Sequence, residues 1–349
     1  MLRRFAIVGL GNAARTIHLP ALRVLPLVAC VGGYDENPAS TKFPFPVFAS
    51  FEEMLSETKP DMLIVATPPS SHFEFVKRGL SAGCHVFCEK PFTESLVEAD
   101  ELVALARDAG RSLVINSEFP WMPIHMAAKK RMEQPGFGRL QFVNIDQTFV
   151  VTAHTEDGWR GQETRRTFKE FGTHVLDLAI YFFGEPPRAL RAKMPRPGGP
   201  ESPDLLCMIE LEFSGERYAH ILLDRLARGR HRYLDIRLDG AEATIETSIG
   251  GRFRATGGVR AASRMPFVDI QLAFGGQARL YKGDEFERLA TAPRNLFANA
   301  TARLLADVIA AIEDGRTPPC DAEYSRRTLA LLLDCYAAAE DGQTRHYGP

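Results

Sequence analysis

The tripeptide Glu89-Lys90-Pro91 follows directly on the apolar run 85–88 and precedes a long helical pattern. The run predicts a buried strand, so the lysine and the carboxylate fall at its carboxyl end, where open α/β sheets bind ligands. A lysine at such an edge is costly to hold unless an anionic or polar group receives it. Taken alone, Lys90 is more often a solvated loop cation than a catalyst. Its chemistry therefore depends on which other motifs reach the same edge.

A glycine-rich turn of the pattern G-x-G-x-x-A stands upstream, between a predicted strand and a predicted helix. The first glycine allows a tight turn, the second lets the backbone approach a pyrophosphate, and the last alanine permits close helix–strand packing. Phosphates would lie at the helix amino terminus, where free N–H groups and the helix dipole favour anions. Such a turn alone is weak evidence, because glycine-rich turns are common. Its residues are Gly9, Leu10, Gly11, Asn12, Ala13 and Ala14.

An acid stands about 20 residues further on, at the end of the second predicted strand, where it would bind the adenosine ribose hydroxyls. This residue is Asp35. The alternative is a plain turn residue, but the turn, helix and acid occur in the order that a dinucleotide site requires. A carboxylate here would repel a 2′-phosphate, so the sequence favours NAD over NADP.

The third predicted strand runs into a proline-containing loop that ends at His72. The prolines end the strand and turn the chain across its carboxyl end, and Ser70 or Ser71 can cap the next helix. In one interpretation this loop lines the nicotinamide half of a cofactor cleft, with Thr67, Pro68 and His72 as binding residues. The alternative is a helix-start loop with a solvated histidine.

Short apolar runs alternate with helical patterns up to about residue 118, which predicts βαβ units and a parallel sheet. After residue 119 the pattern changes to a helix at 122–133, an alternating strand at 140–151 and several strands between 205 and 284. Helices at 296–313 and 327–340 close the fold. The predicted strands of the first part are 5–8, 27–32, 62–66, 86–88 and 112–115, and its helices lie near 13–24, 50–57, 71–81 and 94–109.

The chain has 349 residues, with 45% hydrophobic and 25% charged residues, which suits two soluble domains. Its net charge of −2 gives no electrostatic footprint for nucleic acid or an anionic membrane. No stretch approaches the roughly 20 apolar residues of a membrane span. Arg3-Arg4 resembles a twin-arginine signal only faintly, because the apolar run after it leads straight into the glycine-rich turn. We expect a cytoplasmic protein.

Six cysteines are scattered along the chain, which favours reduced and mostly buried thiols. Cys84 and Cys88 flank His85, but all three fall on one predicted strand and no partner pair follows. No metal site is therefore predicted.

These motifs together resemble the Gfo/Idh/MocA oxidoreductases. The resemblance covers nearly the whole chain and is most specific over residues 62–91, which hold the T-P-x-x-x-H and E-K-P elements. It implies an α/β Rossmann domain with a doubly wound parallel sheet at 1–118. A second α+β domain at 119–349, with a large and mostly antiparallel sheet, would bind substrate and mediate oligomerisation. The family uses NAD or NADP to oxidise or reduce a hydroxyl or keto group of a sugar, polyol or related small molecule.

Glu170, His174 and Asp177 form a polar stripe on a predicted helix that is otherwise apolar. A polar stripe on a buried helix needs a partner or a cavity. A core histidine bonded to one of the two acids would explain a lone histidine, whereas Gly172 costs helix stability and would leave room for a ligand. The resemblance implies that His174 is the catalytic acid/base. Glu170 stands where the family usually has aspartate, and we expect its longer side chain to orient His174 as a third catalytic residue.

The chemistry implied is hydride transfer between a nicotinamide and the substrate carbon. His174 would take the hydroxyl proton, as suits a group that titrates near neutral pH. Lys90 would bond the same oxygen and stabilise its developing charge, and Glu89 would orient Lys90 or the cofactor. Two rivals remain open: a regulator that binds NAD without turnover, and a glycosidase or dismutase whose cofactor stays bound and cycles.

Further residues bear on the substrate. Trp159 and Arg160 match a common pair of the family's substrate loop, and Asp177 is a third candidate substrate-binding residue. Arg165 and Arg166 replace a glycine-rich run; they are either solvated or face the site, where they would favour an acidic or phosphorylated substrate. By analogy with the family we expect a homodimer or homotetramer.

Overall fold

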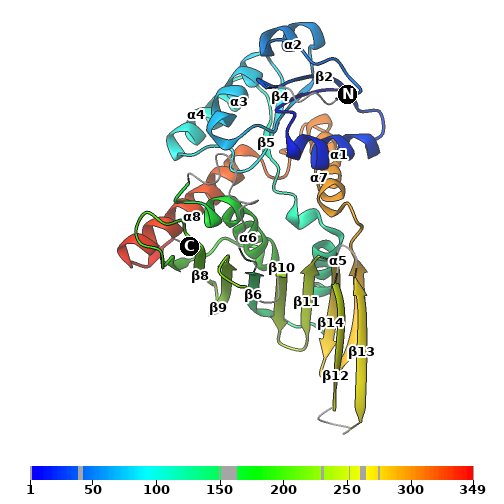
Figure 1. Cartoon of the computed structure of the whole chain (residues 1–349), viewed down its shortest axis with the longest axis vertical. Coiled ribbons are helices and arrows are strands. Elements are labelled where there is room, and N and C mark those ends of the chain that lie inside the picture. The colour runs from blue at the N-terminus through cyan, green and yellow to red at the C-terminus, as the bar shows by residue number, and fades with distance from the viewer. Residues whose placement is uncertain are drawn as a thin grey trace. The chain divides into compact units, whose positions relative to one another are not determined.

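The computed structural model describes residues 2–37, 42–148, 150, 163–228, 232–250, 252–259, 265–273 and 276–348. The chain forms two compact units (Figure 1). The first comprises Met1–Trp121 and Phe297–Leu331, and the second comprises Met122–Leu296 and Leu332–Pro349. Among the residues that the structure describes, every helix is too short or too polar to span a bilayer.

The first unit holds a five-stranded sheet of order β2-β1-β3-β4-β5, in which every neighbouring pair is parallel. The predicted Rossmann sheet is thereby confirmed. The second strand begins two residues later than predicted, because Leu27 adopts a left-handed φ of 64° in the preceding turn. The strands are β1 (Arg4–Val8), β2 (Ala29–Tyr34), β3 (Met62–Val65), β4 (His85–Cys88) and β5 (Leu113–Ile115).

Two of the helices of this unit begin with the S-x-x-E capping pattern. Ser50 and Ser95 each accept a hydrogen bond from the backbone N–H of the glutamate three residues on. The proposed serine cap of the third helix is wrong: Ser71 Oγ donates to Pro68 O instead. The helical segments are η1 (Ala14–His18), α1 (Leu19–Val24), α2 (Phe51–Thr58), η2 (Pro69–Ser71), α3 (His72–Ser81), α4 (Leu96–Asp108), η3 (Phe119–Trp121), α7 (Leu296–Glu313) and the first part of α8 (Ala322–Asp341).

Helix α7 completes one face of the parallel sheet. Alternate strand residues such as Phe5 and Ile7 point to that face, where they form a core cluster with Leu304, Leu305 and Val308 of α7. Helix α7 lies beside α1 in this layer (Figure 1). Because α7 falls far beyond the predicted division at residue 118, the first unit is discontinuous in sequence.

The second unit is built on a nine-stranded sheet of order β15-β14-β11-β10-β6-β9-β8-β7-β16. Only the β6–β9 pair is parallel, which confirms the predicted large and mostly antiparallel sheet. Residues 149 and 151 of the predicted strand 140–151 lie outside the described residues. The strands are β6 (Leu140–Thr148), β7 (Ala189–Lys193), β8 (Leu206–Phe213), β9 (Arg217–Asp224), β10 (Arg232–Gly240), β11 (Thr244–Ile249), β14 (Gly276–Lys282), β15 (Glu285–Thr291) and β16 (Arg345–His346).

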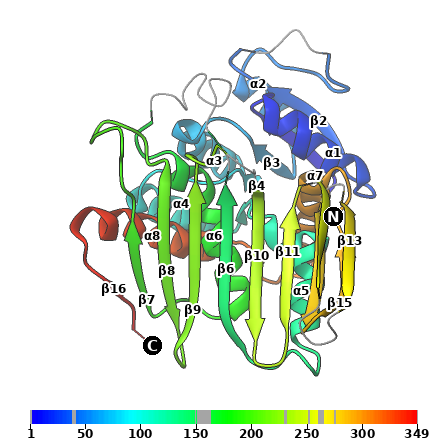
Figure 2. The same ribbon diagram turned by 60° about the horizontal axis from the view of Figure 1, so that its bottom comes forward.

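Two helices cover one face of this sheet (Figure 2). Helix α5 (Pro123–Met132) packs on β11, β14 and β15, and α6 (Thr167–Phe183) packs on β6, β8 and β9. A separate two-stranded ribbon consists of β12 (Arg252–Val259) and β13 (Pro266–Ala273).

A buried carboxylate from outside the helix caps the amino end of α6. Asp204 is fully buried and accepts hydrogen bonds from the backbone N–H groups of Arg166 (2.6 Å), Thr167 (2.8 Å) and Phe168 (3.2 Å). Tyr336 donates its hydroxyl to the same carboxylate at 2.8 Å and accepts the Lys169 N–H at 2.9 Å. A negative charge is favoured at a helix amino terminus, so Asp204 fixes the start of the helix that carries Glu170, His174 and Asp177.

Candidate active site

The glycine-rich turn has the geometry that a dinucleotide cradle needs. Gly9 has a φ of +85°, and a Cβ there would lie 2.6 Å from the backbone carbon of Ala66, so only glycine fits. A Cβ on Gly11 would meet no atom within 4 Å, so the backbone there faces open space. Ala14 is fully buried in the core cluster. The turn therefore leaves room for a pyrophosphate at Gly11 while Gly9 and Ala14 bring strand and helix together.

The first helical residues after the turn are polar or small. Asn12 is exposed, and its carbonyl accepts the Thr16 hydroxyl at 2.8 Å. Ala13 directly precedes η1. The first N–H groups of a helix have no partner within it, so this end is suited to bind an anion.

Asp35 is held beside the turn by two backbone N–H groups. Its Oδ2 accepts from Leu10 N at 2.7 Å, and its Oδ1 accepts from Asn37 N at 2.8 Å. The residue is half-buried. An ionised carboxylate has about four acceptor sites, so both oxygens keep capacity for ribose hydroxyls.

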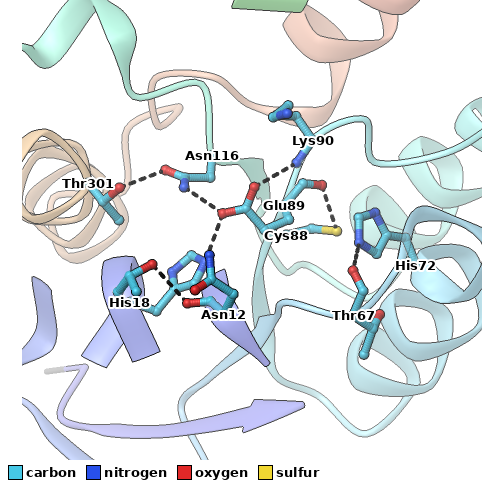
Figure 3. Close-up of polar contacts among 10 residues, drawn as sticks. Asn12, His18, Thr67, His72, Cys88, Glu89, Lys90, Asn116 and Thr301 are labelled. Carbon is cyan, nitrogen blue, oxygen red and sulfur yellow. Dashed lines mark hydrogen bonds and ion pairs between the residues drawn. The ribbon is translucent and has the colours of Figure 1, made fainter. Parts of the chain in front are cut away.

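Glu89 lies at the centre of a polar network at the carboxyl end of β4 (Figure 3). Its Oε1 stands 2.9 Å from His18 Nε2 and accepts from Asn116 Nδ2 at 2.9 Å. Its Oε2 accepts the backbone N–H of Lys90 at 3.3 Å. Thr301 of α7 donates its hydroxyl to Asn116 Oδ1 at 3.3 Å. The network thus joins segments that are far apart in the chain.

The network keeps Glu89 ionised. Burial by itself would raise the pKa of Glu89, but the hydrogen bond and charge of His18, the charge of Lys90 and the hydrogen bond of Asn116 outweigh it and lower the pKa to about 2. Lys90 is half-buried next to this carboxylate, which supplies an anionic neighbour for the lysine.

His72 fastens two loops at this edge of the sheet. The ring is fully buried, with Nδ1 2.8 Å from Pro91 O and Nε2 2.8 Å from Thr67 O. Burial lowers the pKa of His72, although the two carbonyls oppose this effect. The alternative of a solvated histidine is wrong. A direct bond from His72 to a cofactor stays a prediction. Such a bond would require one of the two carbonyl contacts of the ring to break.

The Thr67–Pro68 segment is therefore held from both sides. Ser71 Oγ lies 2.9 Å from Thr67 Oγ1 and 2.9 Å from Pro68 O, while His72 engages the Thr67 carbonyl. These contacts order the loop at the carboxyl end of β3.

In the second unit, the predicted polar stripe lies on α6 as expected. His174 is 4% exposed and Asp177 is 2% exposed, whereas Glu170 is half-buried. The ring of His174 stands edge-on to Phe171, with their centroids 6.4 Å apart.

An arginine that the sequence analysis did not single out joins this cluster. Arg225 is buried, and its guanidinium lies 4.6 Å from the Phe171 ring centre, within the range of a cation–π contact. Burial lowers the pKa of Arg225 to about 10, against the opposing charge of Glu170. Glu170 therefore acts electrostatically on Arg225.

The expectation that Gly172 leaves room for a ligand is wrong. A Cβ on Gly172 would lie 3.0 Å from ring atoms of Phe168, which is itself fully buried. The glycine accommodates a neighbouring core side chain.

The substrate-loop residues Trp159 and Arg160 lie outside the described residues. Arg165 is exposed at the helix start, where it pairs with Glu340 at 2.7 Å and lies over the Tyr336 ring. Arg166 is buried. Over the part of the chain that the structure describes, no group of three His, Cys, Asp or Glu side chains could hold a metal ion.

Sequence reasoning missed His18, Asn116, Thr301 and Arg225. Asn116 directly follows β5, so its place at the carboxyl edge of a parallel sheet was a usable signal. His18 lies four residues from Ala14 and from Leu22, on an otherwise apolar helix face. No local signal marks Thr301, which arrives from a distant helix.

Two family models match the chain. Residues 3–117 match the oxidoreductase family with an NAD-binding Rossmann fold, and residues 125–246 match the GFO/IDH/MocA C-terminal domain. Together they cover more than half of the sequence, so the chain belongs to the Gfo/Idh/MocA oxidoreductase family. The resemblance inferred from the motifs is confirmed.

Known relatives agree with this assignment. An uncharacterized oxidoreductase of Schizosaccharomyces pombe is 31% identical over 193 residues, 52% of either chain. The D-apiose dehydrogenase of Paraburkholderia graminis is 25% identical over 289 residues, 75% of this chain and 72% of that enzyme. The chain spans about half the length of most curated relatives that it matches.

The fold also matches a solved structure. The aldose-aldose oxidoreductase of Caulobacter crescentus superposes with a TM-score of 0.80 at 21% identity, over 99% of this chain and 100% of the other. At this identity the likeness shows the fold alone.

Proposed function

We propose that the protein is a nicotinamide-dependent oxidoreductase that transfers a hydride to or from a sugar-, polyol- or sugar-acid-like alcohol or ketone. The observation that carries the proposal is Lys90, held beside the ionised Glu89 at the carboxyl end of β4 in the same parallel sheet as the glycine-rich turn. Retention of both Lys90 and His174 weighs against a regulator that lacks turnover.

The cofactor proposed is NAD. Gly9, Gly11 and Ala14 shape the turn, Asn12 and Ala13 begin the helix, and Asp35 would accept hydrogen bonds from the adenosine ribose. Thr67, Pro68, His72, Glu89 and Lys90 would order the nicotinamide half. Asp35 supports NAD over NADP because an ionised carboxylate repels a 2′-phosphate.

When bound, the nicotinamide supplies the hydride acceptor or donor. His174 would act as the acid/base on the substrate hydroxyl, and Lys90 would donate a hydrogen bond that stabilises developing negative charge on oxygen. The charges of Glu170 and Arg225 interact and together set the electrostatic environment of the helix that carries His174. Asp177, Trp159 and Arg160 are the proposed substrate contacts.

The substrate class draws support from the relatives, among which D-apiose dehydrogenase acts on a sugar by its name. We further propose a homodimer or homotetramer in the cytoplasm. The six free cysteines suit a reducing compartment, and light scattering would measure the assembly.

The test is cofactor reduction by absorbance, with stripped protein, NAD or NADP, and a panel of sugars, inositols and sugar acids. Lys90→Met should lower kcat at least about a hundredfold. Lys77→Met is the matched control, since Lys77 pairs with Glu101 on the surface of the same unit. Turnover that persists in Lys90→Met would contradict the proposed role of Lys90.

Absence of turnover across the panel would contradict the dehydrogenase proposal. Tight NADH binding in that case would favour an NAD-binding regulator. A cofactor that survives stripping by dialysis would favour the cycling-cofactor alternative.

A further inference from the structure

The network around Glu89 draws its members from four separate segments of the first unit. His18 ends η1, Glu89 follows β4, Asn116 follows β5 and Thr301 lies on α7. Figure 3 shows His18, Asn116 and Lys90 gathered around the Glu89 carboxylate. Two other segments thereby reach the Glu89 side chain directly, through His18 and Asn116, and Glu89 directly precedes Lys90.

The network is costly to bury, which calls for an explanation beyond packing. His18 and Thr301 are fully buried, Asn116 is 1% exposed and the Glu89 side chain is 13% exposed. Replacing buried polar groups by apolar ones of similar shape is often neutral or stabilising. A core that needed only a joint between helix and sheet could use leucine at residue 18, like the neighbouring Leu19 and Leu22.

His18 is placed for one contact. Its Nε2 lies 2.9 Å from Glu89 Oε1, whereas its Nδ1 is buried with no hydrogen-bond partner among the residues that the structure describes. An ionised carboxylate only accepts hydrogen bonds, so Nε2 carries the hydrogen and donates it. The ring therefore donates to Glu89 through Nε2, while Nδ1 is buried without a partner among the described residues.

The two oxygens of Glu89 have different partners. Oε1 is held by the side chains of His18 and Asn116, while Oε2 faces the Lys90 peptide at 3.3 Å. Fixing Oε1 therefore fixes the direction of Oε2 and the place of the negative charge beside Lys90.

We propose that His18 is a positioning residue of the reaction: it donates to Glu89 and thereby holds the carboxylate as the fixed counter-charge of Lys90, with Asn116 as the second donor and Thr301 orienting Asn116. This inference rests on the proposed function. It adds to that function a residue that acts through Glu89 and Lys90 without touching substrate.

The experiment compares His18→Leu, which removes the donor, with His18→Gln, whose amide can still donate. His85→Leu is the matched control, because His85 lies at the other end of β4 and its Nδ1 accepts the Ser112 N–H. The kcat and KM of each variant are measured from pH 5 to 9, with NADH affinity by fluorescence over the same range.

We expect His18→Leu to lower kcat by about 10- to 100-fold, the worth of one hydrogen bond to a charged group. Its NADH affinity at pH 8 should change less than about threefold, and His18→Gln should restore most of kcat. His18→Leu should also show a new fall in kcat at acidic pH. Burial raises the pKa of Glu89, and without His18 less opposes this effect, so the carboxylate becomes protonatable. The charged or titratable groups that act with Glu89 are His18, Lys90, His72 and Cys88.

Equal loss of kcat and NADH affinity in both His18 variants would overturn the proposal and leave His18 as a structural core residue. An unchanged kcat in His18→Leu would overturn it as well. If wild-type protein binds NADH but turns over no substrate, the proposed function fails separately. In that case NADH affinity tests the network. We expect His18→Leu to lose NADH affinity at acidic pH, and we expect no such loss in His18→Gln and His85→Leu.

Discussion

Two buried carboxylates organise the two units in different ways. Asp204 is fully enclosed and is bonded by backbone N–H groups at the start of α6, with one tyrosine hydroxyl. Glu89 keeps 13% of its side chain exposed and is bonded mainly by the side chains of His18 and Asn116, beside the charge of Lys90.

The difference separates a structural charge from one that we propose to be functional. Backbone donors at a helix start do not titrate and are present whenever the helix is folded, so Asp204 stabilises α6 and nothing about it needs to change. The donors to Glu89 are mainly side chains, which substitution can remove, and the charge that they fix adjoins a candidate catalytic lysine. A carboxylate bonded by side chains at the end of a strand is therefore the better signal of a site.

The substitution with the largest expected effect is Asp204→Ala, which tests the structural role of Asp204 in this comparison. Three N–H groups and the Tyr336 hydroxyl would lose their acceptor, which we expect to lower the free energy of unfolding by about 3 kcal/mol or more. Urea denaturation followed by circular dichroism measures this change. A loss below about 1 kcal/mol would mean that water or another group replaces the cap.

Glu89→Gln should change the acid stability of the protein. The pKa of Glu89 lies near 2 in the folded state and near its ordinary value of 4.5 when unfolded. Its depressed folded value means that the ionised form contributes stability above pH 4.5, and this contribution is lost as the pH falls towards 2. The contribution is up to about 3 kcal/mol.

The measurement is the free energy of unfolding of wild type and Glu89→Gln between pH 2.5 and 6. The gap between the two proteins should close as the pH falls. A constant gap would show that the pKa of Glu89 is not lowered in the folded protein.

Tyr336→Phe should lower the free energy of unfolding by about 2 kcal/mol, the net worth of two buried hydrogen bonds at about 1 kcal/mol each. The 2.8 Å bond to Asp204 disappears, and the Lys169 N–H loses its acceptor, whereas the ring packing on Phe168 remains. Burial and the Asp204 charge raise the pKa of Tyr336, so the hydroxyl stays protonated and the loss should be independent of pH up to 10. A pH-dependent difference between wild type and variant would contradict this account.

The smallest effect is expected for Thr301→Val, which should lower the free energy of unfolding by about 0.5 kcal/mol. The bond to Asn116 is long at 3.3 Å, and valine has the same shape as threonine. The kcat should fall less than about threefold, well short of the His18→Leu effect. A larger loss of activity than in His18→Leu would move the centre of the network from His18 to α7.

Local patterns predicted much of this architecture. The five parallel strands, the helix at 296–313 and the polar stripe of α6 follow from periodicity and turn residues, which depend on short segments of chain. The partners of these elements could not be predicted in the same way. Asp204 and Tyr336 reach α6 from segments far along the chain, and Thr301 reaches Asn116 across 185 positions. The prediction at Gly172 was wrong because a glycine in a helix indicates crowding without indicating which group causes it.

The placement of α7 has a consequence for biosynthesis. The sheet that would bind the dinucleotide begins at Arg4, yet its core is completed by Leu304, Leu305 and Val308. Contacts over such long stretches of chain form slowly. While the ribosome is still adding the second unit, the first third of the chain carries an apolar sheet face that α1 covers only in part. A growing chain of this protein therefore needs protection, by a chaperone or by transient cover of its own, until about 300 residues have emerged.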